Sequence, residues 1–219
     1  MVQQSDIRTE EGIWMAKPTH ALSATVVREF YNLCNRAHEL WINHLELFDK
    51  NPRNAEITES IARPEWNRLF SISQEYSFLQ IVKLHDKAVM NGNITLGIDY
   101  VFTYGGWSSS VRSDLERLKE KLDRFANQLR GVRNKVLSHN DLATILAGAR
   151  LGSLAEGDDE KYFEALQEFV NIVHDQVVGG PCPFSNLVKN DIAFFLRTIK
   201  PLPIRKQSKS LTSPPTPCA

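Results

Sequence analysis

The stretch RNKVLSHND, residues 133–141, brings three side chains with complementary chemistry close together: Arg133, Asn134 and His139. An imidazole can take up or release a proton near neutral pH. A guanidinium can hold a phosphate through two parallel hydrogen bonds and stabilise its developing charge. A carboxamide can hold either partner in place. Such a set can cleave RNA through attack of the ribose 2′-hydroxyl, and it needs neither a metal ion nor another cofactor.

These residues continue the clearest helical pattern of the chain, which predicts a helix over residues 110–139. Ser113 and Glu116 fit a capping box near its start. Because His139 is the next position of the apolar seam, the alternative interpretation is a half-buried core histidine satisfied by a neighbour. The seam has the narrow spacing of helical bundles and consists of Leu115, Leu118, Leu122, Phe125, Leu129, Val132 and Val136.

The spacing of the two candidate catalytic residues limits how they can meet. On one straight helix, Arg133 and His139 are separated by roughly 120° around the axis and ~9 Å along it. They can converge at the edge of the seam, through the reach of the arginine, or by pairing with a second copy of the helix. A twofold dimer would bring two such sets to one cleft.

The remainder of the chain has few strand signals, so we expect an all-α antiparallel bundle with long helices. Residues 1–17 are predicted to be an N-terminal arm, 18–199 a helical domain, and 200–219 a disordered basic tail rich in Pro and Ser. A first helix is predicted from Pro18 to the turn at 51–54, with Thr19 as its N-cap. Residues 94–104 are predicted to form a short helix, and a strand is the alternative. The other predicted helices are Pro64–Met90, 158–177 and 191–199.

Composition limits the possible partners. The 26 basic and 26 acidic residues balance, so no global field attracts nucleic acid or a membrane surface, and a phosphate-binding patch must be local. The three cysteines lack zinc-ligand spacing and fit a reducing compartment. The polar N-terminus lacks the features of a signal peptide. No apolar run approaches the ~20 residues that a helix needs to span a bilayer. We therefore expect a cytoplasmic protein with no membrane partner.

Arg133 to His139 resembles the Arg-polar-x4-His motif of the HEPN superfamily, and Asn134 together with the following HND resembles the abortive-infection (AbiU-like) branch. The segment SFLQIVKLHDKA at 77–88, then NITL, a Gly-rich break and the motif helix, follows the order of that branch. The resemblance covers about residues 20–180.

The resemblance implies a metal-independent endoribonuclease that acts as a homodimer with a composite cleft and leaves a 2′,3′-cyclic phosphate. Proteins of this kind are often toxins or phage-defence effectors. The expected partners are RNA and a second copy, and an antitoxin or regulatory protein is a further candidate. Arg133 and His139 carry over as catalytic residues, and Asn134 as the neighbour that orients them. The alternative is a non-catalytic HEPN-like domain that binds a nucleotide or a protein partner.

Several residues near the motif are candidates for binding. Arg130 and Lys135 are cations that can assist with phosphates. Asp86 in the LHDKA segment is a candidate polar contact, although a solvated carboxylate on a helix face is the alternative. His85 beside it is predicted to lie at the surface or in the core. The remaining binding candidates are Ser138 and Asp141.

Overall fold

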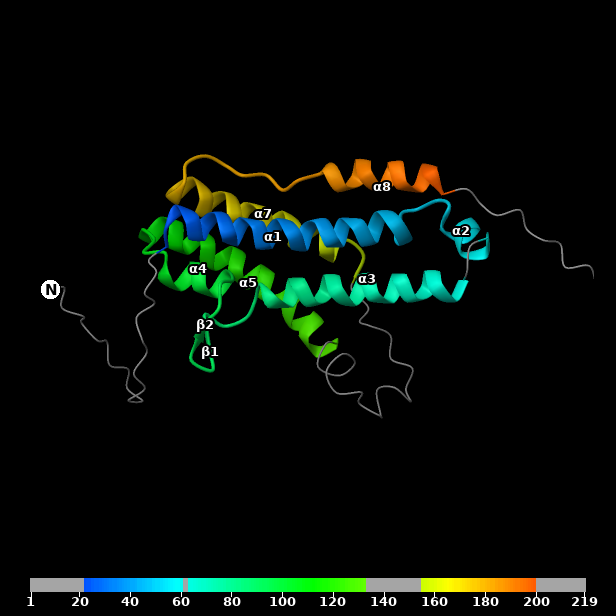
Figure 1. The fold of residues 1–219 in the computed structure, drawn as a ribbon. Coiled ribbons are helices and arrows are strands. Elements are labelled where there is room, and N and C mark those ends of the chain that lie inside the picture. The colour runs from blue at the N-terminus through cyan, green and yellow to red at the C-terminus, as the bar shows by residue number, and fades with distance from the viewer. Residues whose placement is uncertain (1–21, 61–62, 133–154, 200–219) are drawn as a thin grey trace, which may run out of the picture.

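The computed structural model describes residues 22–60, 63–132 and 155–199 (Figure 1). The predicted motif, residues 133–141, lies outside these ranges. The elements are α1 (Ala24–His44), the π-helical turn η1 (Leu45–Asp49), α2 (Asn54–Ser60), α3 (Arg63–Lys83), β1 (Val89–Met90), β2 (Asn93–Ile94), α4 (Ile98–Tyr104), α5 (Ser109–Val132), α7 (Asp158–Val177) and α8 (Leu187–Thr198).

Four long helices form the bundle in the described part of the chain, which confirms the predicted all-α fold. Helix α1 packs against α3 on one side and α7 on the other, and α5 packs against α7 and α3. Helix α8 lies along α1 and η1 (Figure 1). The described α5 seam is buried in the main core, as its spacing predicts, and the rings of Phe30 and Phe169 meet edge to face there with centroids 6.1 Å apart.

The first helix begins later than predicted and ends in a wider turn. Its N-cap is Ser23, whose hydroxyl oxygen accepts a hydrogen bond from the Val26 N–H at 3.3 Å, so the predicted cap at Thr19 is wrong. At the other end, the chain passes into η1, where the Lys50 N–H donates to the Leu45 carbonyl oxygen at 2.7 Å. A small second core beyond this turn contains Phe48, Ile57 and Trp66. Helix α2, which contributes to it, was not predicted.

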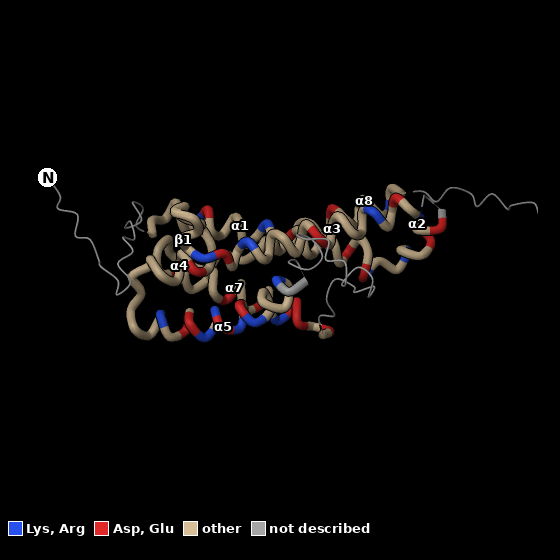
Figure 2. The backbone as a smooth tube through the Cα atoms, turned by 90° about the horizontal axis from the view of Figure 1, so that it is seen from below, with Lys and Arg blue, Asp and Glu red and all other residues tan. Residues whose placement is uncertain are grey.

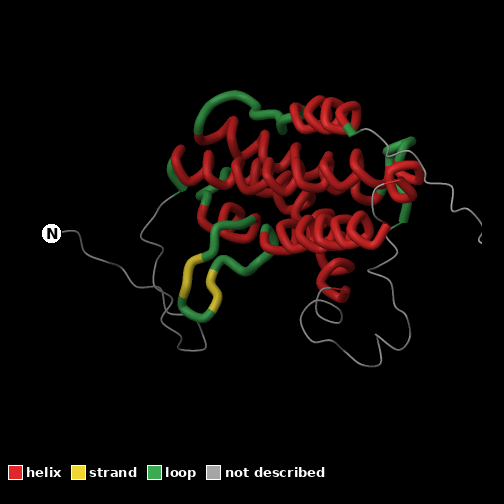
Figure 3. Tube along the Cα trace, turned by 45° about the vertical axis from the view of Figure 1, so that its right-hand side comes forward, coloured by secondary structure: helices red, strands yellow, loops and turns green. Residues whose placement is uncertain are grey.

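The prediction of one helix over Pro64–Met90 is wrong after Lys83. The N–H groups of residues 84–86 bond to carbonyls three residues back, which closes α3 with a tight turn. A two-residue hairpin follows, with Asn91 and Gly92 both at positive φ between β1 and β2 (Figure 3). Asn-Gly is the preferred sequence of such a turn, because both of its residues must adopt left-handed backbone angles.

The segment before α4 holds the turn after α3 in place. The Ile98 N–H donates to the Leu84 carbonyl oxygen at 2.8 Å. A Cβ atom on Gly97 would lie 2.7 Å from that same oxygen, so glycine is required for this close approach. The short helix predicted within 94–104 is confirmed for Ile98–Tyr104, whereas residues 93–94 form a strand.

The remaining helix boundaries differ in instructive ways. Helix α5 starts at Ser109 and the Ser108 carbonyl oxygen accepts from the Arg112 N–H at 2.8 Å, so the predicted capping box at Ser113 and Glu116 is wrong. Helix α7 has the predicted bounds, and α8 begins four residues earlier than predicted. In the described part of the chain, no helix combines the length and apolar character that crossing a membrane requires.

Candidate functional site

Helix α5 leads directly to the predicted motif, because its last residue, Val132, immediately precedes Arg133. Of the predicted site residues, Arg130 and Asp86 lie within the described part of the chain. The structure therefore describes the helix end that precedes the motif in the sequence. The site residues outside the described ranges are Arg133, Asn134, Lys135, Ser138, His139 and Asp141.

Arg130 fixes the end of α5 to the turn that follows α3. Its Nη2 donates to the carbonyl oxygen of His85, and its Nη1 donates to Oδ1 of Asn127 at 3.3 Å. Its guanidinium is thus already engaged with the protein, three residues before the motif. The LHDKA segment and the last turn of α5, which are separate in the sequence, are therefore neighbours at this point.

The imidazole of His85 joins three parts of the bundle. Its Nδ1 lies 2.8 Å from Oδ1 of Asp123 on α5, and its Nε2 lies 3.0 Å from the hydroxyl of Tyr162 on α7. Lys119 donates to the other Asp123 oxygen at 2.7 Å. We call these residues, together with Arg130, the His85 junction. It ties the end of α3 to both α5 and α7.

The protonation states of the junction follow from burial and pairing. Burial works to raise the pKa of Asp123, but hydrogen bonds from His85 and Lys119 outweigh it and lower that pKa to about 2. Burial lowers the pKa of His85 and raises that of Tyr162 well above its usual value. A neutral His85 therefore donates from Nδ1 to the Asp123 carboxylate and accepts at Nε2 from the Tyr162 hydroxyl.

Burial makes the junction a support and not a reaction centre. The His85 side chain is 1% exposed and its partner Tyr162 is 3% exposed, so no substrate reaches the imidazole. Buried polar groups that are fully paired favour one arrangement of the elements that carry them. We therefore assign the His85–Asp123–Tyr162 set to positioning the end of α5.

Asp86 has a different environment from its neighbour. Its side chain is half-buried and makes no hydrogen bond or ion pair with the described residues, and its N–H bonds to the Lys83 carbonyl oxygen at 3.2 Å. It lies in the turn after α3, so the alternative that placed it on a helix face is wrong. Its carboxylate remains available to a partner at the surface.

The sequence did not identify His85, Asp123 or Tyr162 as a set. The histidine is separated by 38 residues from Asp123 and by 77 from Tyr162, and no local pattern reports such pairings. The one local signal was the spacing of Lys119 and Asp123, because residues four apart face each other on a helix. That signal predicts an ion pair but not the histidine behind it.

The outer face of α5 alternates in charge, as the sequence predicts (Figure 2). A cavity of about 410 Å³ lies between α5 and α7, and its lining balances the cations Lys121, Arg124 and Lys161 against the acids Asp158, Glu164 and Glu168. Arg117 nearby is paired with Glu168 at 3.2 Å. This face therefore offers no concentrated positive surface to a nucleic acid.

Comparison with known proteins gives a clear family relationship. The family model for AbiU2, a HEPN family, matches residues 22–193. The chain belongs to the AbiU2 family of HEPN proteins. This match confirms the predicted superfamily and its abortive-infection branch, and it spans the bundle from the residues before α1 into α8, with the RNKVLSH motif inside it. No curated protein and no solved structure matches the chain.

Proposed function

We propose that this AbiU2-family protein is a metal-independent endoribonuclease that serves as a toxin or phage-defence effector. Membership of the family supports a role in abortive infection. The residues Arg133, Asn134 and His139 supply the chemistry that RNA cleavage requires. The observation that carries the proposal is the fixed end of α5, whose last turn is held through Arg130 at the His85 carbonyl oxygen. In the sequence, the proposed set begins at the residue that follows this helix.

The proposed reaction is a transesterification within the RNA. His139 accepts the proton of the 2′-hydroxyl, whose oxygen attacks the adjacent phosphorus, and the bond to the 5′-oxygen breaks. An imidazolium returns a proton to that leaving oxygen. Arg133 holds the phosphate and stabilises the charge on its oxygens, and Asn134 orients the reacting groups. The products are a 2′,3′-cyclic phosphate and a 5′-hydroxyl.

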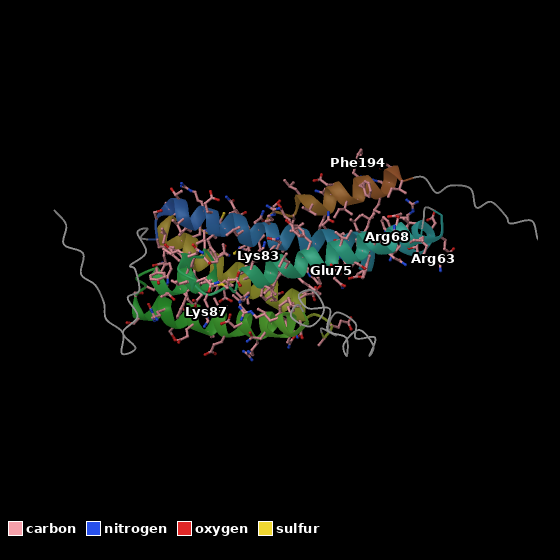
Figure 4. All side chains as sticks on the ribbon, turned by 60° about the horizontal axis from the view of Figure 1, so that its bottom comes forward. Arg63, Arg68, Glu75, Lys83, Lys87 and Phe194 are labelled. Carbon is pink, nitrogen blue, oxygen red and sulfur yellow. The ribbon has the colours of Figure 1, made fainter. Side chains whose placement is uncertain are left out.

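The cleft is proposed to be shared by two copies of the chain, so that one His139 acts as base and the other as acid. An exposed apolar stripe on α3 supports this homodimer: Leu69, Ile72 and Tyr76 are 52%, 62% and 38% exposed. Figure 4 shows the charged residues Arg68 and Glu75 along this helix. In an antiparallel pair of α3 helices centred near Ile72, Arg68 of one copy approaches Glu75 of the other, and the pairing occurs twice.

Dimer formation has a direct test. Light scattering of the full chain at micromolar concentration should report the mass of two copies, and Ile72→Lys should shift that mass toward one copy. Lys87→Glu, an exposed change on the turn after α3, serves as the matched control and should leave the dimer intact. A single-copy mass for the unaltered chain throughout this range would remove the composite cleft from the proposal.

The test of catalysis is incubation of the full chain with total RNA in excess EDTA. We expect cleavage fragments that end in a 2′,3′-cyclic phosphate, because no step uses a metal ion. His139→Ala should abolish the fragments while RNA binding, carried by neighbouring cations, survives. Equal cleavage by both proteins would overturn the proposal. The roles of Arg130, Lys135, Ser138, Asp141 and Asp86 in RNA binding remain predictions for the same assay.

The second candidate function is a non-catalytic HEPN domain that binds a nucleotide or a protein partner. The balanced charge of the chain and of the outer face of α5 favours it, because unspecific RNA binding usually requires a basic surface. Retention of RNA or nucleotide by the unaltered chain, without any cleavage product, would identify this function instead.

A further inference from the structure

A long groove runs along α7. Its volume is about 690 Å³, and it is bounded by α7, by the second half of α1 and by the segment that leads into α8. Its lining on α7 extends from Asp159 to Ile172, which corresponds to ~20 Å along the helix axis. We call this feature the acidic groove. A groove of that length accommodates a peptide segment of about six extended residues.

The lining of the groove carries more acids than bases. Asp159, Glu160, Glu164 and Glu168 line it, against Lys50 and Lys189, so the net charge is +2 − 4 = −2. His38 adds no positive charge, because burial lowers the pKa of its imidazole.

Most of these carboxylates already have partners within the protein, but one does not. Glu160 lies 3.5 Å from the Lys50 ammonium, and Glu168 lies 3.2 Å from Arg117. Asp159 accepts a hydrogen bond from the Trp41 indole at 2.8 Å. Exposed Glu164 has neither a hydrogen bond nor an ion pair with any described residue. It is therefore the carboxylate best placed to receive an incoming cation.

The groove also offers apolar surface of a limited kind. Trp41, Phe163 and Phe184 line it but are only 6–7% exposed, so a ligand can contact only a small part of each ring. Half-buried Ile42 and Ile172 add aliphatic contact. Recognition at such a surface depends on charge first and on small apolar side chains second.

We propose that the acidic groove is the docking site of residues 200–209 of the same chain, KPLPIRKQSK. This segment carries four cations, Lys200, Arg205, Lys206 and Lys209, and the sequence has no acid anywhere in 200–219. Leu202 and Ile204 match the aliphatic part of the groove in size. Pro201 and Pro203 favour an extended backbone, which suits a long groove.

The segment starts close enough to reach the groove. Lys189 lines the groove, and Ile199 lies ten residues further along α8 and its C-cap, or ~15 Å away. The Ile199 carbonyl oxygen accepts a hydrogen bond from Arg53 at 3.3 Å, which fixes the point of departure near Lys50 at one end of the groove. An extended chain covers ~3.3 Å per residue, so Arg205 can lie ~20 Å from Ile199.

Because residues 200–209 are covalently attached to the bundle, they can occupy the groove even if their affinity for it is low. A tethered segment has an effective concentration of about millimolar when its length matches the distance it must span. A segment with few apolar residues can become ordered when it binds to such a surface. The net negative lining disfavours the main rival class of occupant, an anionic nucleotide or RNA strand, because its phosphates would be repelled.

The proposal is tested by carbodiimide cross-linking of the full chain, read by mass spectrometry on an equal mixture of ¹⁴N- and ¹⁵N-labelled protein. This reagent joins a lysine to a carboxylate that it contacts. Glu56 is the internal control. It is exposed, and Arg53 contacts both its carboxylate and the Ile199 carbonyl oxygen, so Glu56 lies near the start of the segment. A segment that does not dock in the groove should therefore react with Glu56 more often than with Glu164. We expect Lys206 and Lys209 to join Glu164 within one chain at least threefold more often than Glu56.

Two matched variants sharpen the result. Arg205→Gln removes a cation that cannot itself react, and it should reduce the Glu164 cross-links at least threefold. Arg197→Gln removes an exposed cation on α8 that, among the described residues, bonds to its own helix backbone, and it should leave these cross-links unchanged.

Two outcomes overturn the proposal. Cross-links between labelled and unlabelled chains would mean that a second copy supplies the occupant. Predominant reaction with Glu56, insensitive to Arg205→Gln, would leave the groove to a separate ligand. The assay contains no RNA, so its result is independent of the proposed ribonuclease activity.

Discussion

Neighbouring residues of α7 belong to two regions of opposite character. Tyr162 enters the His85 junction, where its hydroxyl and the His85 imidazole are buried and paired within the protein. Phe163 and Glu164 line the acidic groove, where the Glu164 carboxylate has no described partner. Paired and buried polar groups hold elements together, whereas unpaired groups at a surface remain available for recognition. The same helix thus supports a candidate catalytic segment and presents a candidate binding surface.

The largest contrast between the regions should come from His85→Ala. The change leaves the Tyr162 hydroxyl and the inner Asp123 oxygen without their partner and opens a cavity, so the free energy of unfolding should fall by about 3 kcal/mol. Glu164→Gln in the groove is the matched control and should change it by less than about 0.5 kcal/mol. Urea unfolding of both proteins measures the difference. Similar values would show that the junction does not hold the bundle.

Asp123→Asn should have a smaller effect of the same kind. The carboxamide keeps the shape but loses the charge that holds the Lys119 ammonium and orients His85, so we expect a loss of about 1–2 kcal/mol in urea unfolding. The loss should be greatest near neutral pH. If it persisted unchanged at pH 2, where the native carboxyl is also becoming protonated, the carboxylate charge would not be its cause.

The pH dependence of stability should reveal the junction in two steps. Burial lowers the folded-state pKa of His85, so the unfolded chain binds more protons and stability should fall as pH drops from about 7 towards 5. Asp123 has a folded pKa of about 2, so its contribution is present above pH 4 and disappears as pH falls towards 2.

Melting temperatures across this range, with Asp123→Asn alongside, test the assignment. The variant should show a smaller step between pH 4 and 2, because it lacks the Asp123 contribution. It should retain part of the step between 7 and 5, to which buried His44 also contributes because burial lowers its pKa too. A profile for the variant that matches the unaltered protein in the acidic step would contradict the role given to Asp123.

The smallest effect should be that of Glu164→Gln on catalysis. If the junction and the groove act separately, this variant should cleave RNA within about twofold of the unaltered chain. His85→Ala, measured under conditions in which it remains folded, should cleave more slowly. The carbonyl oxygen of residue 85, to which Arg130 donates, is then no longer held in place by the side-chain bonds to Asp123 and Tyr162. A large loss of cleavage in Glu164→Gln would show that the two sides of α7 are coupled.

The sequence predicted regular features well and long-range pairings poorly. Helix α7 has the bounds that the sequence predicts, because apolar residues at helical spacing run through it and the glycines at 179–180 follow its end. The hairpin at Asn91-Gly92 was missed, because the apolar residues before it continue the helical spacing of α3. The junction was missed because His85 finds its partners through tertiary packing, which periodicity does not report. The residue types and spacing of the motif indicate the family, but they do not predict how the side chains of the motif are arranged in space.

The measurement that tests the central claim most directly is single-turnover cleavage of one RNA, in excess EDTA, by the unaltered chain and two charge-conserving variants. Arg133→Lys keeps a positive charge but cannot hold a phosphate through two parallel bonds, so cleavage should fall at least a hundredfold. Arg124→Lys, on the exposed face of α5, should cleave within about twofold of the unaltered chain. Equal rates for all three proteins, with equal RNA binding, would contradict a catalytic role for the motif.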